Sequence, residues 1–62
     1  MLWTVLRCRN EDGTICGHIR ITSDQRDKLN PYNTYTVVQW GLTDGQSRSL
    51  LRELNKHHNS DD

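Results

Sequence analysis

The chain has 62 residues, and its eight Lys and Arg side chains balance eight Asp and Glu side chains. This length suits one small domain, and the neutral charge excludes a polybasic tail and a strongly acidic solvating segment. Hydrophobic residues form 32% of the chain, and no apolar run is long enough to cross a membrane. A domain of this size has a thin core, so such proteins commonly gain stability from a disulfide, a metal ion or a second subunit.

The first two predicted elements are strands over residues 2–9 and 14–22, joined by a tight turn. The sequence Asn-Glu-Asp-Gly between them is typical of a three-residue loop, over residues 11–13, that ends in a left-handed glycine. With this loop, Cys8 pairs with Cys16. One face of the hairpin would then carry Trp3, Val5, Ile15, Ile19 and Ile21. The opposite face would carry Leu2, Thr4, Leu6, Cys8, Cys16, His18 and Arg20.

A two-residue loop over residues 12–13 would shift the strand pairing by one position. Because side chains alternate between the two faces of a strand, this shift would bring Trp3 and Val5 to the face of His18. It would also separate them from the isoleucines of the second strand. The hydrophobic pattern therefore favours the three-residue loop.

A short helix and a third strand are predicted next. Thr22 and Gln25 form a capping-box pattern, which predicts a short helix over residues 23–29. The β-branched and aromatic residues that follow predict a strand over residues 32–40, which Gly41 ends.

A second capping box, formed by Thr43 and Gln46, predicts a C-terminal helix over residues 44–57 with one apolar stripe. The stripe consists of Leu50, Leu51 and Leu54. The predicted fold class is α+β, a three-stranded antiparallel sheet in the order β-β-short α-β-α with the C-terminal helix packed on one face. One domain would span residues 1–58, followed by a polar tail over residues 59–62. The third strand can pair with either edge of the hairpin.

One helix covers only one face of such a sheet, so the other face is expected to be available to a partner. Exposed apolar patches on small soluble proteins usually mark interfaces. We therefore expect a small non-enzymatic protein-binding module, a regulator or an inhibitor, that docks this face on a partner or on a second copy as a homodimer. The expected partner-binding residues are Leu2, Leu6, Cys16, His18, Arg20, Tyr35, Val38 and Trp40.

The two cysteines are expected to be small, partly buried thiols. A zinc site built from Cys8, Cys16 and His18 is the alternative, because these three ligands share the predicted face. Against zinc stands the absence of a C-x-x-C motif. Against a disulfide stands the predicted position of the pair at a hydrogen-bonded site of the hairpin, where the strand separation suits a disulfide poorly.

The alternative function is nucleic-acid binding by the arginine-bearing hairpin and a basic stripe on the C-terminal helix. Six of the eight cations are arginines, which recognise phosphates and base edges well. The neutral net charge counts against this interpretation, since nucleic-acid-binding domains usually carry a strongly basic surface. The residues of this alternative are Arg7, Arg9, Arg20, Arg48, Arg52 and Lys56.

Catalysis is not expected, because the sequence contains neither a G-x-S-x-G nucleophile motif nor a phosphate-binding loop. No cofactor, small-molecule substrate or membrane partner is expected either. The first apolar stretch, residues 2–6, is too short for the core of a signal peptide. A cytoplasmic location with reduced thiols is therefore expected.

Overall fold

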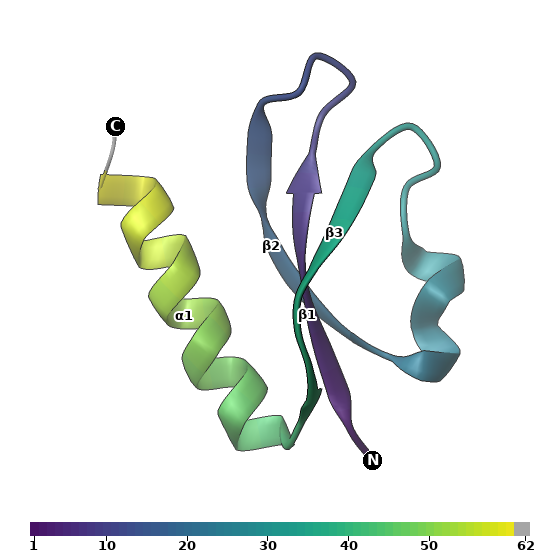
Figure 1. Cartoon of the computed structure of the whole chain (residues 1–62), viewed down its shortest axis with the longest axis vertical. Helices are drawn as coiled ribbons and strands as arrows, with labels where there is room; N and C mark the ends of the chain where they lie inside the picture. The colour runs from purple at the N-terminus through teal and green to yellow at the C-terminus, as the bar shows by residue number, and fades with distance from the viewer. Residues whose placement is uncertain (61–62) are drawn as a thin grey trace.

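The computed structural model describes the backbone of residues 1–60 and the side chains of residues 1–56. Its elements follow the predicted order and form the predicted α+β fold, a three-stranded antiparallel sheet with the C-terminal helix packed against it (Figure 1). The elements are β1 (Trp3–Arg9), β2 (Ile15–Thr22), the 3₁₀ helix η1 (Ser23–Lys28), β3 (Thr34–Leu42) and α1 (Asp44–Ser60).

The three strands begin one or two residues later than predicted, and η1 ends one residue earlier. Two other ends extend beyond the prediction. β3 continues through Gly41 to Leu42, two residues past the expected end. α1 continues to Ser60, into the segment predicted as a polar tail. Residues 61–62, the rest of that predicted tail, lie outside the described residues.

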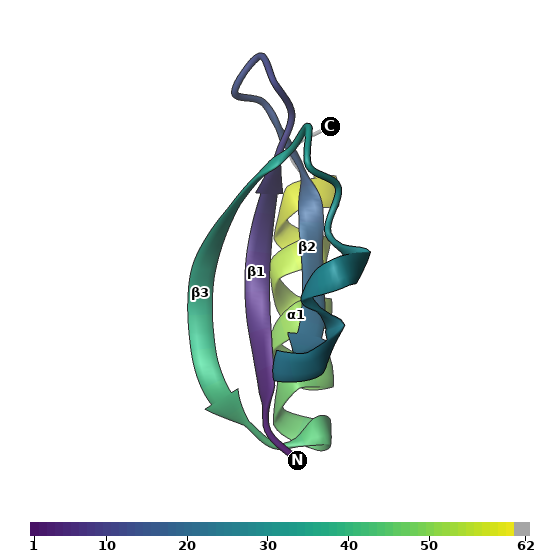
Figure 2. The ribbon, with the colours of Figure 1, turned by 90° about the vertical axis from the view of Figure 1, so that its right-hand side faces the viewer.

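The strand order is β2-β1-β3, and β1 is antiparallel to both of its neighbours. β2 and β3 therefore run in the same direction with β1 between them. Their connection, residues 23–33, has to cross the sheet to reach β3. Figures 1 and 2 show that η1 lies on the side of the sheet opposite α1. The sheet is thus covered on one face by α1 and partly covered on the other by the connection.

The turn of the β1–β2 hairpin has the predicted three-residue loop. The backbone N–H of Asn10 donates to the carbonyl of Thr14 at 2.8 Å, and Gly13 has a φ of 89°. Beyond the turn, however, the pairing shifts by one residue, because Cys8 lies opposite Gly17. The extra residue on β2 forms a β-bulge. Gly17 has a φ of 143°, a backbone conformation that glycine adopts without strain.

The bulge makes the predicted faces wrong over most of the hairpin. Residues directly opposite each other in an antiparallel pair share a face of the sheet. Val5 lies opposite Arg20, and Leu6 lies opposite Ile19. The face beneath α1 therefore carries Trp3, Val5, His18 and Arg20. The other face carries Thr4, Leu6, Cys8, Ile19 and Ile21.

α1 packs on the face that carries Val5, whose side chain is fully buried. Arg20 lies beside it, with its guanidinium carbon 4.0 Å from the ring centroid of Trp3. The same guanidinium forms an ion pair with Asp44 and donates to Ser47 Oγ at 3.1 Å. Ser47 is fully buried, whereas the leucine stripe of α1 is only half-buried. The first turn of α1 is therefore held by a polar contact around one arginine.

The ion pair between Arg20 and Asp44 is expected to make the stability of the fold depend on pH. The hydrogen bond from Arg20 is the main cause that holds the pKa of Asp44 below its usual range; burial opposes it, and Arg48 adds a weaker attraction. A carboxylate with a lowered folded-state pKa stabilises the fold above its unfolded-state pKa of about 3.9, and this stability is lost as the pH falls through the folded-state pKa. We expect Asp44→Asn to be less stable than the wild type at neutral pH and to lose less stability below about pH 4.

Thermal unfolding of both chains between pH 7 and pH 2 measures this difference. Asp12 and Asp24 also have lowered pKa values, because Thr14 and Thr22 donate hydrogen bonds to them. Asp44→Asn should therefore keep part of the acid sensitivity. Parallel pH profiles for the two chains would contradict the role given to Asp44.

Candidate functional site

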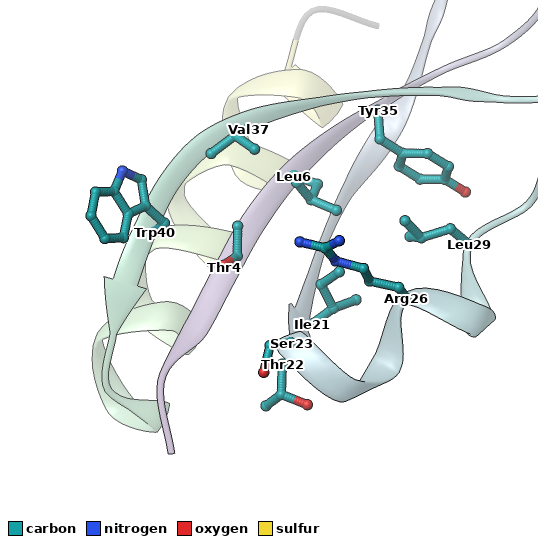
Figure 3. A pocket seen from close by; sticks show the side chains of 10 residues that line it. All are labelled: Thr4, Leu6, Ile21, Thr22, Ser23, Arg26, Leu29, Tyr35, Val37 and Trp40. Atoms are coloured by element: carbon teal, nitrogen blue, oxygen red, sulfur yellow. The ribbon is translucent and has the colours of Figure 1, made fainter.

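The face opposite α1 carries a groove of about 420 Å³. β1 and β2 form its floor, and η1, the residue after it and β3 contribute the remaining lining (Figure 3). Its lining residues are Thr4, Leu6, Ile21, Thr22, Ser23, Arg26, Leu29, Tyr35, Val37 and Trp40. Leu6 and Ile21 are buried. Pockets of this size and of mainly apolar lining are typical of binding sites.

β3 provides the most exposed apolar side chains of the groove. Trp40 is 73% exposed and Val37 is 55% exposed. These two residues are three positions apart and would lie on opposite faces of a regular strand. The pairing of β3 with β1 is irregular between them, because Leu6 lies opposite Val37 and Val5 lies opposite Gln39. This irregularity allows Tyr35, Val37 and Trp40 to line the same groove.

The connection between β2 and β3 is held in place by local hydrogen bonds. Thr22 and Gln25 form the predicted capping box, in which Gln25 Oε1 accepts from the backbone N–H of Thr22 at 3.2 Å. At the far end, the backbone N–H of Asn30 donates to the hydroxyl oxygen of Tyr35 at 3.0 Å. These contacts fix both ends of the segment that carries Arg26 and Leu29 into the groove.

Only part of the predicted partner-binding set lies in the groove. Leu6, Tyr35 and Trp40 line it together. Leu2 is exposed but does not line it, and neither does Val38. The remaining three predicted residues are Cys16, His18 and Arg20.

His18 and Arg20 are on the helix-covered face, so the prediction that they share a face with Leu6 is wrong. The backbone N–H of His18 donates to Asn55 Oδ1 of α1 at 3.1 Å. Arg7 Nε donates to His18 Nε2 at 3.3 Å, so Nε2 is the acceptor of the ring. The proton is then on Nδ1, which lies 3.3 Å from Asn55 Oδ1 and donates to it. His18 thus joins β2 to α1.

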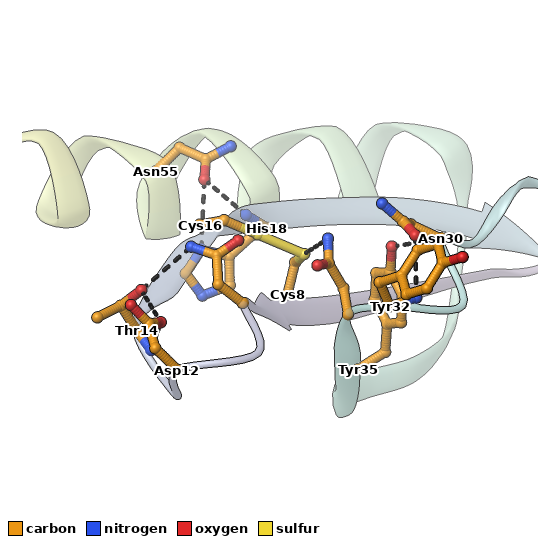
Figure 4. Close-up of a disulfide and its surroundings, with 11 residues drawn as sticks. Cys8, Asp12, Thr14, Cys16, His18, Asn30, Tyr32, Tyr35 and Asn55 are labelled. Atoms are coloured by element: carbon orange, nitrogen blue, oxygen red, sulfur yellow. Dashed lines mark hydrogen bonds between the residues drawn. A yellow bond between two sulfur atoms is a disulfide. The ribbon is translucent and has the colours of Figure 1, made fainter.

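Cys8 and Cys16 form a disulfide, so the prediction of two free thiols is wrong (Figure 4). The bulge displaces Cys16 from the position directly opposite Cys8, and the Cα–Cα distance of 5.6 Å suits a disulfide. Asn33 Nδ2 donates to Cys8 Sγ at 3.3 Å. The alternative zinc site with His18 is also wrong, because the two sulfur atoms are bonded to each other and His18 points to α1. Within residues 1–56, no group of three metal-binding side chains is found.

The cations of the nucleic-acid alternative are largely engaged within the chain. Arg9 donates to the carbonyl of Gly13 at 3.0 Å, and Arg48 lies 3.4 Å from the carboxylate of Asp44. Arg7 and Arg20 make the contacts described above. The other two cations, Arg52 and Lys56, are exposed on α1. A phosphate group would therefore have to replace existing contacts at four of the six positions.

Sequence reasoning missed several residues of the groove, including Ile21, Arg26, Leu29 and Val37. Two signals could have found them. An isolated glycine within a strand, here Gly17, indicates a bulge and hence a change of face. Leu29 is the single apolar residue of the predicted short helix over residues 23–29, and it indicates that this segment packs on the sheet.

Within the described residues, no helix is long and apolar enough to span a membrane. The chain matches no family model, no curated protein and no solved structure.

Proposed function

We propose that this chain is a small protein-binding module without catalytic activity, and that its groove docks a segment of a partner protein. The observation that carries the proposal is the exposure of Trp40 and Val37 beside the buried floor residues Leu6 and Ile21. An exposed aromatic side chain next to an apolar depression is typical of interface centres. By binding a segment of a larger protein and covering it, the chain would act as a regulator or an inhibitor.

The disposition of the cations favours protein over nucleic acid as the ligand. Nucleic-acid binding draws most of its affinity from Lys and Arg side chains that neutralise several phosphates. The groove contains one cation, Arg26, and the chain has no net charge. The disulfide counts against the cytoplasmic location expected from the sequence, because the cytosol keeps most protein thiols reduced.

Selection from a phage-displayed library of random 12-residue peptides tests the proposal on the purified chain. We expect selected peptides to bind the wild type and to lose at least about tenfold in affinity on Val37→Asp, because a carboxylate beside the apolar floor has to be desolvated. Val38→Asp is the matched control, since Val38 is the next residue of β3 but does not line the groove. Circular dichroism checks that both variants fold.

Two results would contradict the proposal. The first is a library that yields no binders, and the second is a set of binders that Val37→Asp leaves unaffected. Light scattering across a range of concentrations tests a second copy as the occupant: a wild type that doubles its mass, while Val37→Asp remains monomeric, would make the groove a homodimer interface. Binding to DNA or RNA that falls steeply with salt would favour the nucleic-acid alternative.

A further inference from the structure

The groove contains a single charged side chain. Of its ten lining residues, nine are apolar or carry only a hydroxyl group or an indole N–H, and the tenth is Arg26. Its side chain extends from η1 toward β1, over the floor formed by Leu6 and Ile21 (Figure 3). A guanidinium group in this position is a fixed positive charge beside an apolar surface.

Within the described residues, Arg26 has no acidic partner in the groove. Both ion pairs found among the described residues are made by Asp44, on the other side of the sheet. The nearest acidic residues in sequence, Asp24 and Asp27, do not line the groove. Asp24 accepts a hydrogen bond from the hydroxyl of Thr22. The donors of the Arg26 guanidinium are therefore available to a ligand.

The charge of the groove thus selects the chemistry of its occupant. A guanidinium group binds a carboxylate through two parallel hydrogen bonds, and it is less strongly hydrated than a lysine ammonium group. Such a pair is stronger beside an apolar surface than in open water, because the surrounding dielectric constant is lower. The apolar floor and Val37 would contact a large apolar side chain at the same time.

We propose that the groove recognises an extended protein segment in which a large apolar side chain lies within one or two residues of an Asp or Glu. The apolar side chain packs on Leu6 and Ile21 beside Val37, and the carboxylate pairs with Arg26. This inference rests on the proposed protein-binding function and adds the sequence preference of the partner.

The test is a parallel selection of the same random 12-residue peptide library on the wild type and on Arg26→Glu. Peptides selected on the wild type should be enriched in Asp or Glu next to Leu, Ile, Phe or Trp. Peptides selected on Arg26→Glu should carry Lys or Arg at the same place. A synthetic peptide from the first set should bind Arg26→Gln about fivefold more weakly than the wild type, which corresponds to a partly exposed ion pair. Its Glu→Gln version should lose this difference between the two proteins.

Lys28→Glu is the matched control, because it makes the same charge reversal on the same segment at a residue that does not line the groove. We expect it to select the same acidic peptides as the wild type. If binders depend on Val37 but show no acidic preference, the inference is wrong and the proposed function stands. If no binder depends on Val37, the proposed function fails as well. A loss of acidic preference on Lys28→Glu would assign the effect to the net charge of η1 and overturn the role of Arg26.

Discussion

Leu6→Ala is expected to lower the free energy of unfolding by about 2–5 kcal/mol, the usual range for leucines removed from well-packed cores. Leu6 is 5% exposed and lies between Ile19 of β2 and Val37 of β3. Small domains have roughly 0.05–0.15 kcal/mol of stability per residue, so this loss is comparable to the whole stability of a 62-residue chain. Thermal and urea unfolding, followed by circular dichroism, measures the effect.

Leu2→Ala is the matched control for this substitution. Leu2 is 61% exposed and precedes β1, so its removal should change the stability by less than about 0.5 kcal/mol. The sequence pattern assigned Leu2 and Leu6 to the same apolar face. Equal losses of unfolding free energy for the two variants would mean that both leucines belong to the core. The assignment of Leu6, but not Leu2, to the floor of the groove would then be wrong.

The order and type of the elements could be predicted because their signals are local. The Asn-Glu-Asp-Gly turn forms the predicted loop, with Gly13 in the left-handed region. Thr43 and Gln46 form the predicted capping box, since the Gln46 backbone N–H donates to Thr43 Oγ1 at 3.2 Å and Gln46 Oε1 accepts from the Thr43 N–H at 3.1 Å. Each of these signals is contained within four residues, so tertiary contacts did not change its outcome.

The faces of the hairpin could not be predicted from the loop alone. The loop sets the register at Arg9 and Ile15, but the bulge at Gly17 changes it from Cys8 onward. Pairing by hydrophobicity favoured Trp3 and Val5 with the isoleucines. In the structure Trp3 instead stacks on Arg20, whose charge is satisfied by Asp44 of α1. The hydrophobic pattern of single strands cannot predict an ion pair between residues 24 positions apart, such as Arg20 and Asp44.

The groove depends on the strand order, which the sequence left open. Because β1 is central, the connection between β2 and β3 has to cross the sheet, and it brings Arg26 and Leu29 to the face that was expected to be bare. α1 does leave the other face uncovered, as expected, but the connection covers part of that face. The connection between β2 and β3 narrows that face to a groove.

The disulfide is the second feature for which a large effect is expected. It closes a loop between residues eight positions apart at the turn of the hairpin. For a loop of this length, the restriction of the unfolded chain corresponds to about 2.5 kcal/mol of stability. Reduction with dithiothreitol, which converts the disulfide to two thiols while the reagent is oxidised, should therefore lower the midpoint of unfolding markedly.

Cys16→Ser separates the loss of the bridge from a loss of packing, because Cys16 is exposed whereas Cys8 is buried and keeps its side chain in this variant. We expect Cys16→Ser to have the stability of the reduced wild type and to be insensitive to dithiothreitol. A wild type that unfolds at the same midpoint with and without reductant would contradict a stabilising bridge. The bulge would then keep the two cysteines close together without the covalent bond, and the stability of the hairpin would rest on its loop and on the packing of Leu6.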